Sequence, residues 1–306
     1  MEIPKLLNTQ ISDVAATSLL TLYCHALEIK SKDPILDDPL AVEITDKLNP
    51  ELSQSDNKLY QRLAKGKVEK NVVVHVAMRA KRYDDYVRNF LERSHQRCSA
   101  VLGVSPMSDC IKNGIVVNIG CGLDTRFHRI DNGKVILYDL DLPEVIAVKK
   151  KLLPETDRYR FIPCSVLNYE WMEAIKELNA DSVLFMAEGV FMYLEEEEVK
   201  SLVLKLQSTF PGCELIAEFF NAAWLKQPLR GIINIKLQRD LQFGKDATFK
   251  FGIRDSKDLE AWNPGIEFLD DWFYLDEPEK KLGLLRVFKD IPFFRKILWT
   301  ARYKLN

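Results

Sequence analysis

Two glycines and a carboxylate in this chain have the spacing of a nucleoside-binding site. Residues 114–122 read Gly-Ile-Val-Val-Asn-Ile-Gly-Cys-Gly, an apolar, β-branched run that predicts a strand buried on both faces. Gly120 and Gly122 permit a sharp turn after it and let a ligand approach the backbone. A second apolar run, 135–138, is followed by Asp-Leu-Asp at 139–141. A carboxylate at that place accepts hydrogen bonds from a ribose diol.

The third glycine of a dinucleotide fingerprint is missing. The pattern GxGxxG would place glycine at position 125, where this chain has Thr125. The close helix packing beneath a pyrophosphate is therefore not encoded, and the ligand need not be a dinucleotide. Asp124 and Thr125 are instead placed to cap a short helix that runs through Phe127 and Ile130.

Three blocks, in the right order, resemble the leucine carboxyl methyltransferase family, which includes bacterial polyketide carboxyl methyltransferases. They are Val-Asn-Ile-Gly-Cys-Gly-Leu-Asp-Thr-Arg-Phe at 117–127, Asp-Leu-Asp-Leu-Pro-Glu-Val-Ile at 139–146 and Ala-Glu-Gly-Val-Phe-Met-Tyr-Leu at 187–194. The resemblance covers residues 34–300 and is strongest over 115–195. It implies a class I S-adenosylmethionine-dependent methyltransferase: an α/β, Rossmann-like fold whose mostly parallel, seven-stranded sheet carries helices on both faces.

The resemblance also implies which residues meet the cofactor. Asp141 matches the family's ribose carboxylate, while Asp139, two residues earlier on the same strand face, is an alternative that spacing leaves open. Ser165 and Val166 match the adenine position, although many family members have aspartate there. The residues expected to contact S-adenosylmethionine are Arg79, Gly120, Cys121, Gly122, Asp124, Asp139, Asp141, Leu142, Ser165, Val166 and Glu188.

Arg79 interrupts the apolar face of a helix predicted over 68–93. Because an unpaired buried guanidinium is costly, Arg79 needs an anionic partner. Two readings are open: a structural ion pair, or a two-hydrogen-bond clamp on the cofactor carboxylate, which the family's matching arginine favours. Glu188 follows the strand predicted over 182–187 and is the candidate for the cofactor ammonium; its alternative is a surface carboxylate. No site residue is expected from the first helix, where Leu22 replaces the basic contact of the leucine-type enzymes.

The expected reaction needs no catalytic base. A carboxylate is already ionised at neutral pH, so alignment and exclusion of water supply most of the rate. A phenol would need a base such as His128 or Tyr193. We expect His128 to be a packing or surface residue and Tyr193 to position the acceptor. The prediction is an O-methyltransferase that makes a methyl ester on a small or polyketide-like carboxylic acid, with a hydroxyl or a protein acceptor left open.

Two rival functions are weighed against this one. An NAD(P)-dependent oxidoreductase on a similar sheet is disfavoured by Thr125 and by the lack of a recognisable hydride-transfer acid. A non-catalytic, cofactor-binding partner protein is disfavoured by the intact glycine loop together with Asp141 and Glu188.

Alternating strands and helices from residue 114 onward predict a parallel sheet covered on both sides. The whole chain, 1–306, is expected to be a single methyltransferase domain, with a helical cap over 1–98 and the core over 110–306. The predicted core strands are 115–119, 135–138, 161–164, 182–187, 214–219, 267–274 and one or two within 284–303. The predicted helices are 12–29, 40–48, 68–93, 143–152, 168–178 and 195–210, with a loop over 49–58.

Residues 221–265 break this alternation and are rich in aromatic and basic side chains, which predicts a substrate lid at the ligand-binding edge. The lid residues singled out are Trp224, Arg230, Arg239, Phe249, Phe251, Arg254 and Trp262.

Composition narrows the function further. A net charge of −2 offers no concentrated basic face for nucleic acid. The six cysteines form no CxxC pair and the four histidines are isolated, so neither a disulfide framework nor a metal site is expected. No signal peptide and no membrane-length apolar run are recognised, which makes the cytoplasm the expected location.

Overall fold

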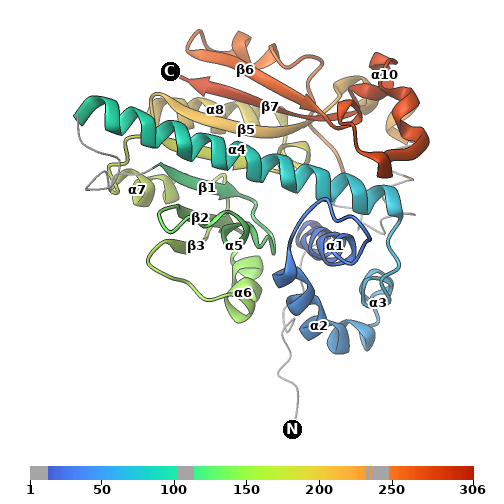
Figure 1. Ribbon diagram of the computed structural model, residues 1–306. Helices are drawn as coiled ribbons and strands as arrows, with labels where there is room; N and C mark the ends of the chain where they lie inside the picture. The colour runs from blue at the N-terminus through green and yellow to red at the C-terminus, as the bar shows by residue number, and fades with distance from the viewer. Residues whose placement is uncertain (1–12, 103–113, 232–234, 236–247) are drawn as a thin grey trace.

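The computed structural model describes residues 13–102, 114–231, 235 and 248–306, and a seven-stranded sheet organises them (Figure 1). The strand order is β3-β2-β1-β4-β5-β7-β6. Neighbouring strands from β3 to β5 are parallel, whereas β7 is antiparallel to both β5 and β6. The strands are β1 Ile115–Ile119, β2 Ile136–Asp141, β3 Tyr159–Pro163, β4 Val183–Ala187, β5 Cys213–Phe220, β6 Ile266–Phe273 and β7 Leu298–Leu305. The predicted mostly parallel, seven-stranded sheet is confirmed.

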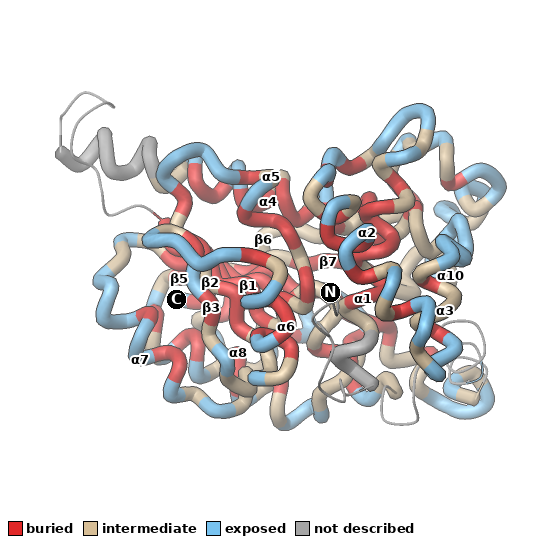
Figure 2. Tube along the Cα trace, turned by 90° about the horizontal axis from the view of Figure 1, so that it is seen from below, coloured by how far each residue is buried: buried red, intermediate tan, exposed pale blue. Residues whose placement is uncertain are grey.

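Helices cover both faces of the sheet, as its fully buried, mostly apolar strands require. Every residue of β1, β4 and β5 is buried, and Figure 2 shows this buried core along the strands. Val116 belongs to the core that includes side chains of α4, α5 and α6, whereas its neighbour Val117 belongs to the core under α7 and α8. These helices are α4 Lys70–Leu102, α5 Arg126–Ile130, α6 Pro143–Leu152, α7 Trp171–Lys176 and α8 Glu196–Thr209.

The three N-terminal helices are α1 Asp13–Glu28, α2 Pro39–Ser53 and α3 Lys58–Ala64. Helix α1 packs against α4, the long helix that crosses one side of the sheet in Figure 1, while α2 packs against α1 and α3 packs against α2. Leu19 and Leu22 of α1 share one core with Val76 and Tyr83 of α4. This packing holds α1 beside the glycine loop, where Ser18 lies against Gly122.

A chain of short elements near the C-terminus lies at the same end of α4 (Figure 1). It comprises η4 Tyr274–Asp276, η5 Lys280–Phe288 and α10 Pro292–Arg295. Val74 and Met78 of α4 pack against Trp272 and Leu282. The remaining short helices are η1 Phe191–Tyr193, η2 Ala222–Leu225 and η3 Asp258–Trp262.

The loop predicted over 49–58 is wrong in most of its length. Helix α2 continues to Ser53 with Pro50 inside it, and α3 begins at Lys58. Leu48 and Leu52 are both fully buried, so the packing of one helix face outweighs the local preference of Pro50 for a break. Asn57 then caps α3 by accepting hydrogen bonds from its first backbone N–H groups.

Strand β2 also extends beyond the predicted 135–138, through Asp141. Asp139 can remain inside the strand because buried polar partners surround its carboxylate.

Within the described part of the chain, none of the helices combines the length and apolar character needed to span a membrane.

Candidate cofactor and acceptor site

A cavity of about 670 Å³ opens at the carboxyl edge of the parallel strands. Loops that follow four neighbouring strands line it: Gly120–Leu123 after β1, Leu142 after β2, Ser165 and Val166 after β3, and Glu188 after β4. Arg79 of α4 reaches it from one side. Of the residues expected to contact the cofactor, only Asp139 does not line this cavity.

The glycine loop is fixed by its neighbours as well as by its turn. Gly120 and Gly122 both have positive φ, +63° and +52°, where other residues are strained. A Cβ on Gly120 would lie 2.5 Å from Cγ2 of Val190, and one on Gly122 would lie 2.7 Å from Cβ of Ser18. The glycine loop therefore passes between Val190, which follows β4, and Ser18 of α1, and its backbone faces the cavity.

Asp141 is the carboxylate that faces the cavity. Its Oδ2 accepts a hydrogen bond from Gly122 N at 2.7 Å, and its Oδ1 accepts one from Leu142 N at 2.7 Å. Burial raises the pKa of Asp141 to about 6, although these two backbone donors act in the opposite direction. The carboxylate thus holds the glycine loop against the end of β2 and keeps lone pairs for a ligand.

The expectation that Asp139 contacts the cofactor is not met by this geometry. Asp139 is 1% exposed and accepts hydrogen bonds from Tyr159 Oη at 2.6 Å and Asn118 Nδ2 at 3.1 Å. It also pairs with the ammonium of the fully buried Lys149. Because an unpaired buried ammonium is costly, Asp139 is committed to Lys149 beneath the loop and does not reach the cavity.

Arg79 forms structural ion pairs, which was one of the two roles that the sequence left open for it. Its Nε donates to Glu188 Oε1 at 2.7 Å and its Nη1 to Glu218 Oε2 at 2.8 Å. Burial alone would lower the pKa of Arg79, but the two carboxylates raise it above the ordinary value. Its Nη2 donates to no other described residue. These two hydrogen bonds use two of the five guanidinium N–H groups, so Nη2 keeps its donors for a ligand.

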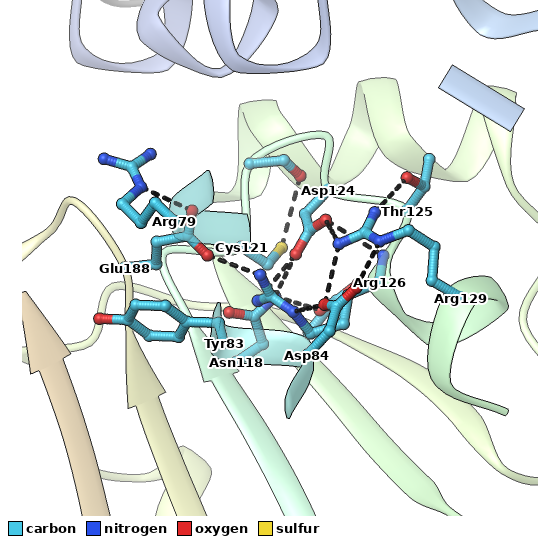
Figure 3. A network of polar contacts seen from close by, with 12 residues as sticks. Arg79, Tyr83, Asp84, Asn118, Cys121, Asp124, Thr125, Arg126, Arg129 and Glu188 are labelled. Atoms are coloured by element: carbon cyan, nitrogen blue, oxygen red, sulfur yellow. Dashed lines mark hydrogen bonds and ion pairs between the residues drawn. The ribbon is translucent and has the colours of Figure 1, made fainter. Parts of the chain in front are cut away.

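Glu188 and Asp124 are held by an arginine that the sequence analysis did not single out (Figure 3). Arg126 of α5 donates to Glu188 Oε2 at 2.6 Å and to Asp84 Oδ1 at 2.7 Å, and its Nη1 lies 2.9 Å from Asp124 Oδ2. Arg126 is only 1% exposed. Burial opposes ionisation of Glu188, but Arg79 and Arg126 lower its pKa below the usual value. Glu188 is therefore a fixed, ionised carboxylate on the cavity wall.

Arg129, one turn later on α5, extends this network to the helical cap (Figure 3). It donates to Asp84 at 2.7 Å, to Asp38 at 2.8 Å and to Asp124 at 3.1 Å. Asp38 is also the N-cap of α2. These buried ion pairs thus connect Asp124, just after the glycine loop, to α4 and to the start of α2.

The first helix supplies part of the wall, although no site residue was expected from it. Thr17, Ser18, Leu20 and Thr21 line the cavity, while Leu22 is 1% exposed in the core. The available signal was the hydroxyl-bearing side chains of one helical turn, Thr17, Ser18 and Thr21, in an otherwise apolar helix.

The far side of the cavity is apolar and comes mainly from the C-terminal short elements. Tyr193, the residue expected to position the acceptor, lies in this wall, and burial raises its pKa above the usual value. The other apolar side chains there are Val72, Met192, Phe249, Leu275, Leu285, Phe288, Phe294, Ile297 and Leu298.

The segment 221–265 contributes little to the described wall. Of the lid residues singled out from the sequence, Arg239 lies outside the described residues, and among the others only Phe249 lines the cavity. Phe251 and Trp262 belong to the core on the α8 side of the sheet, and Trp224 stacks on Phe293 with ring centroids 4.5 Å apart. Among the described residues, more of the wall comes from 274–298 than from 221–265, and residues 232–234 and 236–247 of the predicted lid lie outside the described ranges.

His128, the weighed alternative base, does not line the cavity. Its ring packs edge-on against Tyr159, 5.7 Å between centroids, which fits the expected packing role. The described cysteines, Cys24, Cys121, Cys164 and Cys213, are free thiols. Within the described ranges, no three His, Cys, Asp or Glu side chains are grouped to hold a metal ion.

The sheet order, with its antiparallel β7 and its cavity at the strand ends, defines the class of protein: this is the class I S-adenosylmethionine-dependent methyltransferase fold. Residues 105–207 match the family model for leucine carboxyl methyltransferase, which confirms the resemblance. With this family match, the chain is an S-adenosylmethionine-dependent methyltransferase, and the oxidoreductase alternative is not favoured.

Curated relatives match most of the chain. The tetracenomycin polyketide synthesis O-methyltransferase TcmP of Streptomyces glaucescens is 28% identical over 270 residues, 88% of this chain and 86% of that protein. An S-adenosyl-L-methionine-dependent methyltransferase, dpfgK, of Gibberella zeae is 23% identical over 85% of this chain and 82% of its own length. Among solved structures, a DUF574 family protein of Streptomyces avermitilis aligns with a TM-score of 0.48 at 14% identity, over 98% of this chain and 100% of that one.

Proposed function

We propose that this chain is an O-methyltransferase that converts a carboxylate of a small, largely apolar acid into its methyl ester. The observation that carries the proposal is that one cavity joins a polar end, built by the strand-end loops, to an apolar end. The matched family is described as a carboxyl methyltransferase, and the polyketide product named for TcmP supports a small, apolar acceptor.

The donor groups at the polar end suit the parts of S-adenosylmethionine. Asp141 keeps lone pairs for the ribose diol. Glu188, ionised and held between Arg79 and Arg126, has the charge for the ammonium of the methionine part. Arg79 would reach the carboxylate of that part through its Nη2. We assign the adenine to the wall at Ser165 and Val166, with Leu142 beside it.

The carboxylates on the wall also suit a sulfonium. The carboxylates that line the cavity are Glu69, Asp124, Asp141, Glu188 and Glu218. A cation bound among them is stabilised in a site that is partly shielded from water.

The reaction needs positioning from the chain and no base. S-adenosylmethionine supplies the methyl group: the bond from carbon to the acceptor oxygen forms while the carbon–sulfur bond breaks, and its electron pair stays on sulfur. The acceptor begins as a carboxylate and ends as a neutral ester, so no proton moves. Tyr193 and the apolar wall would hold the acceptor body and exclude water, which is where most of the rate originates.

The acceptor oxygen is tested by transfer of a labelled methyl group. Incubation with methyl-labelled S-adenosylmethionine and a panel of aryl carboxylic acids is expected to give a product that releases labelled methanol in alkali. Bovine serum albumin, as a protein acceptor, is expected to stay unlabelled. An alkali-stable labelled product would move the acceptor to a hydroxyl, and a labelled protein would overturn the small-molecule assignment.

A further inference from the structure

His75 lies in the cavity next to the acceptor wall. It is on α4, one helical turn before Arg79, and its side chain lines the cavity with 18% of its surface exposed. The ring packs edge-on against Tyr274, with centroids 4.4 Å apart and planes at 86°. Contact with Tyr274 of η4 therefore fixes the ring at the boundary between the polar and the apolar ends.

A buried carboxylate faces this ring. Glu218, on β5, is 2% exposed, and its Oε1 lies 3.8 Å from His75 Nε2 while its Oε2 accepts the hydrogen bond from Arg79. His75 Nε2 is buried and has no hydrogen-bond partner. The ionisable groups run Glu188, Arg79, Glu218, His75 along the wall.

Groups that can carry a positive charge are scarce in the described cavity wall. Among the described side chains that line the cavity, only Arg79 and His75 can carry one. Arg79 is already paired with two carboxylates, and in the proposed site its Nη2 is used by the cofactor. His75 Nδ1 forms no hydrogen bond with a described residue. An acidic acceptor that enters the apolar end therefore meets His75.

We propose that His75 donates a hydrogen bond to the carboxylate of the acceptor, and that the acceptor is an apolar, aromatic carboxylic acid. This inference rests on the proposed function. The Nδ1–H donates to one carboxylate oxygen and leaves the other oxygen for the methyl group. His75 keeps this proton throughout, because esterification moves none. The neutral ester accepts a weaker hydrogen bond than the carboxylate does, which favours release of the product.

The test compares a charged and a neutral ligand of the same shape. Calorimetry on the protein saturated with S-adenosylhomocysteine measures the binding of 2-naphthoate and of 2-naphthamide. We expect the wild type to bind 2-naphthoate more tightly, and His75→Asn to weaken that binding by about 10- to 100-fold, as loss of a charge-assisted hydrogen bond implies. Binding of 2-naphthamide and of S-adenosylhomocysteine should change little.

Two further variants test the donor and its position. His75→Lys supplies a charged N–H donor and should recover part of the affinity for 2-naphthoate. His128→Asn, a histidine outside the cavity, should leave the affinities for both naphthyl ligands unchanged.

Three results would overturn the assignment of His75: 2-naphthamide binding the wild type as tightly as 2-naphthoate, equal losses of both ligands in His75→Asn, or no binding of 2-naphthoate to the loaded wild type. The first and third need no variant, so they hold even if His75→Asn does not fold. Failure of the wild type to bind S-adenosylhomocysteine would instead remove the proposed function itself.

Discussion

Replacing Asp141 with asparagine separates the two carboxylates of β2. Asp141→Asn removes the negative charge that faces the cavity but keeps the size of the side chain. In the proposed site, the ribose diol donates to this carboxylate, and hydrogen bonds to a charged group contribute about 1.5–3 kcal/mol. The affinity for S-adenosylhomocysteine should therefore fall by roughly 10- to 150-fold at pH 7.5.

The raised pKa of Asp141 predicts how the affinity of the wild type depends on pH. The pKa is about 6 in the unliganded protein, and the ribose requires the ionised form. Affinity should therefore be full above about pH 6 and fall as pH decreases through it, by about tenfold at pH 5 because only one molecule in about eleven is ionised there. Asp141→Asn cannot titrate at this position, so its affinity should stay nearly level over the same range.

Asp139→Asn is the matched control on the same strand. Asp139 pairs with Lys149 and lies outside the cavity, so its loss should lower the free energy of unfolding, by about 3–5 kcal/mol for a broken buried pair. Cofactor affinity of the folded control should stay within a few-fold of wild type. Calorimetry between pH 5 and 7.5 measures both variants. A larger loss of affinity in Asp139→Asn, or an unchanged pH dependence in Asp141→Asn, would refute the assignment of Asp141.

The other predictions concern the loop, the buried charges and ligand choice. Gly120→Ala should lower the free energy of unfolding by about 1–3 kcal/mol more than Gly133→Ala, because both have positive φ but only the first Cβ meets a neighbour, Val190; urea denaturation of both variants measures the difference. Arg126→Gln should destabilise the fold by about 3–5 kcal/mol, because three buried carboxylates lose a partner. Denaturation with and without S-adenosylhomocysteine should also show weaker stabilisation by that ligand, and an undiminished effect would mean that Arg126 does not hold Glu188 for the cofactor. Wild type should bind S-adenosylhomocysteine but not NADH in calorimetry, and the reverse preference would contradict the methyltransferase assignment.

Local sequence patterns were sufficient to predict the parallel sheet and the glycine loop. Apolar runs closed by glycine or by acidic residues predicted the strands, because strands buried on both faces consist mostly of apolar residues. Gly120, Gly122 and Asp141, which line the cavity, could be singled out because they lie where strands end, and strand ends are encoded over a few residues.

The same local patterns could not predict ion pairs between residues that are far apart in the sequence. Asp139 and Asp141 are two residues apart and lie on the same face of β2, so the sequence does not distinguish them. The difference comes from Lys149 on α6, which pairs with Asp139. Arg126 forms ion pairs with Asp84 of α4 and with Glu188 after β4. These residues are far apart in the sequence, so no local pattern predicts the pairs.

The contribution of the C-terminal short elements to the cavity wall was not predicted, for a related reason. Short 3-10 turns such as η4 and η5 have no sustained period that would distinguish them from a surface tail. The aromatic residues of 221–265 were more conspicuous in sequence, yet several of them fill the core.

A crystal structure with S-adenosylhomocysteine tests the central claim most directly. The account predicts the ligand in the cavity at the strand ends, with its ribose hydroxyls within hydrogen-bond distance of Asp141 and its amino-acid end beside Glu188 and Arg79. A ligand bound outside this cavity, or a ribose held by residues other than Asp141, would contradict it.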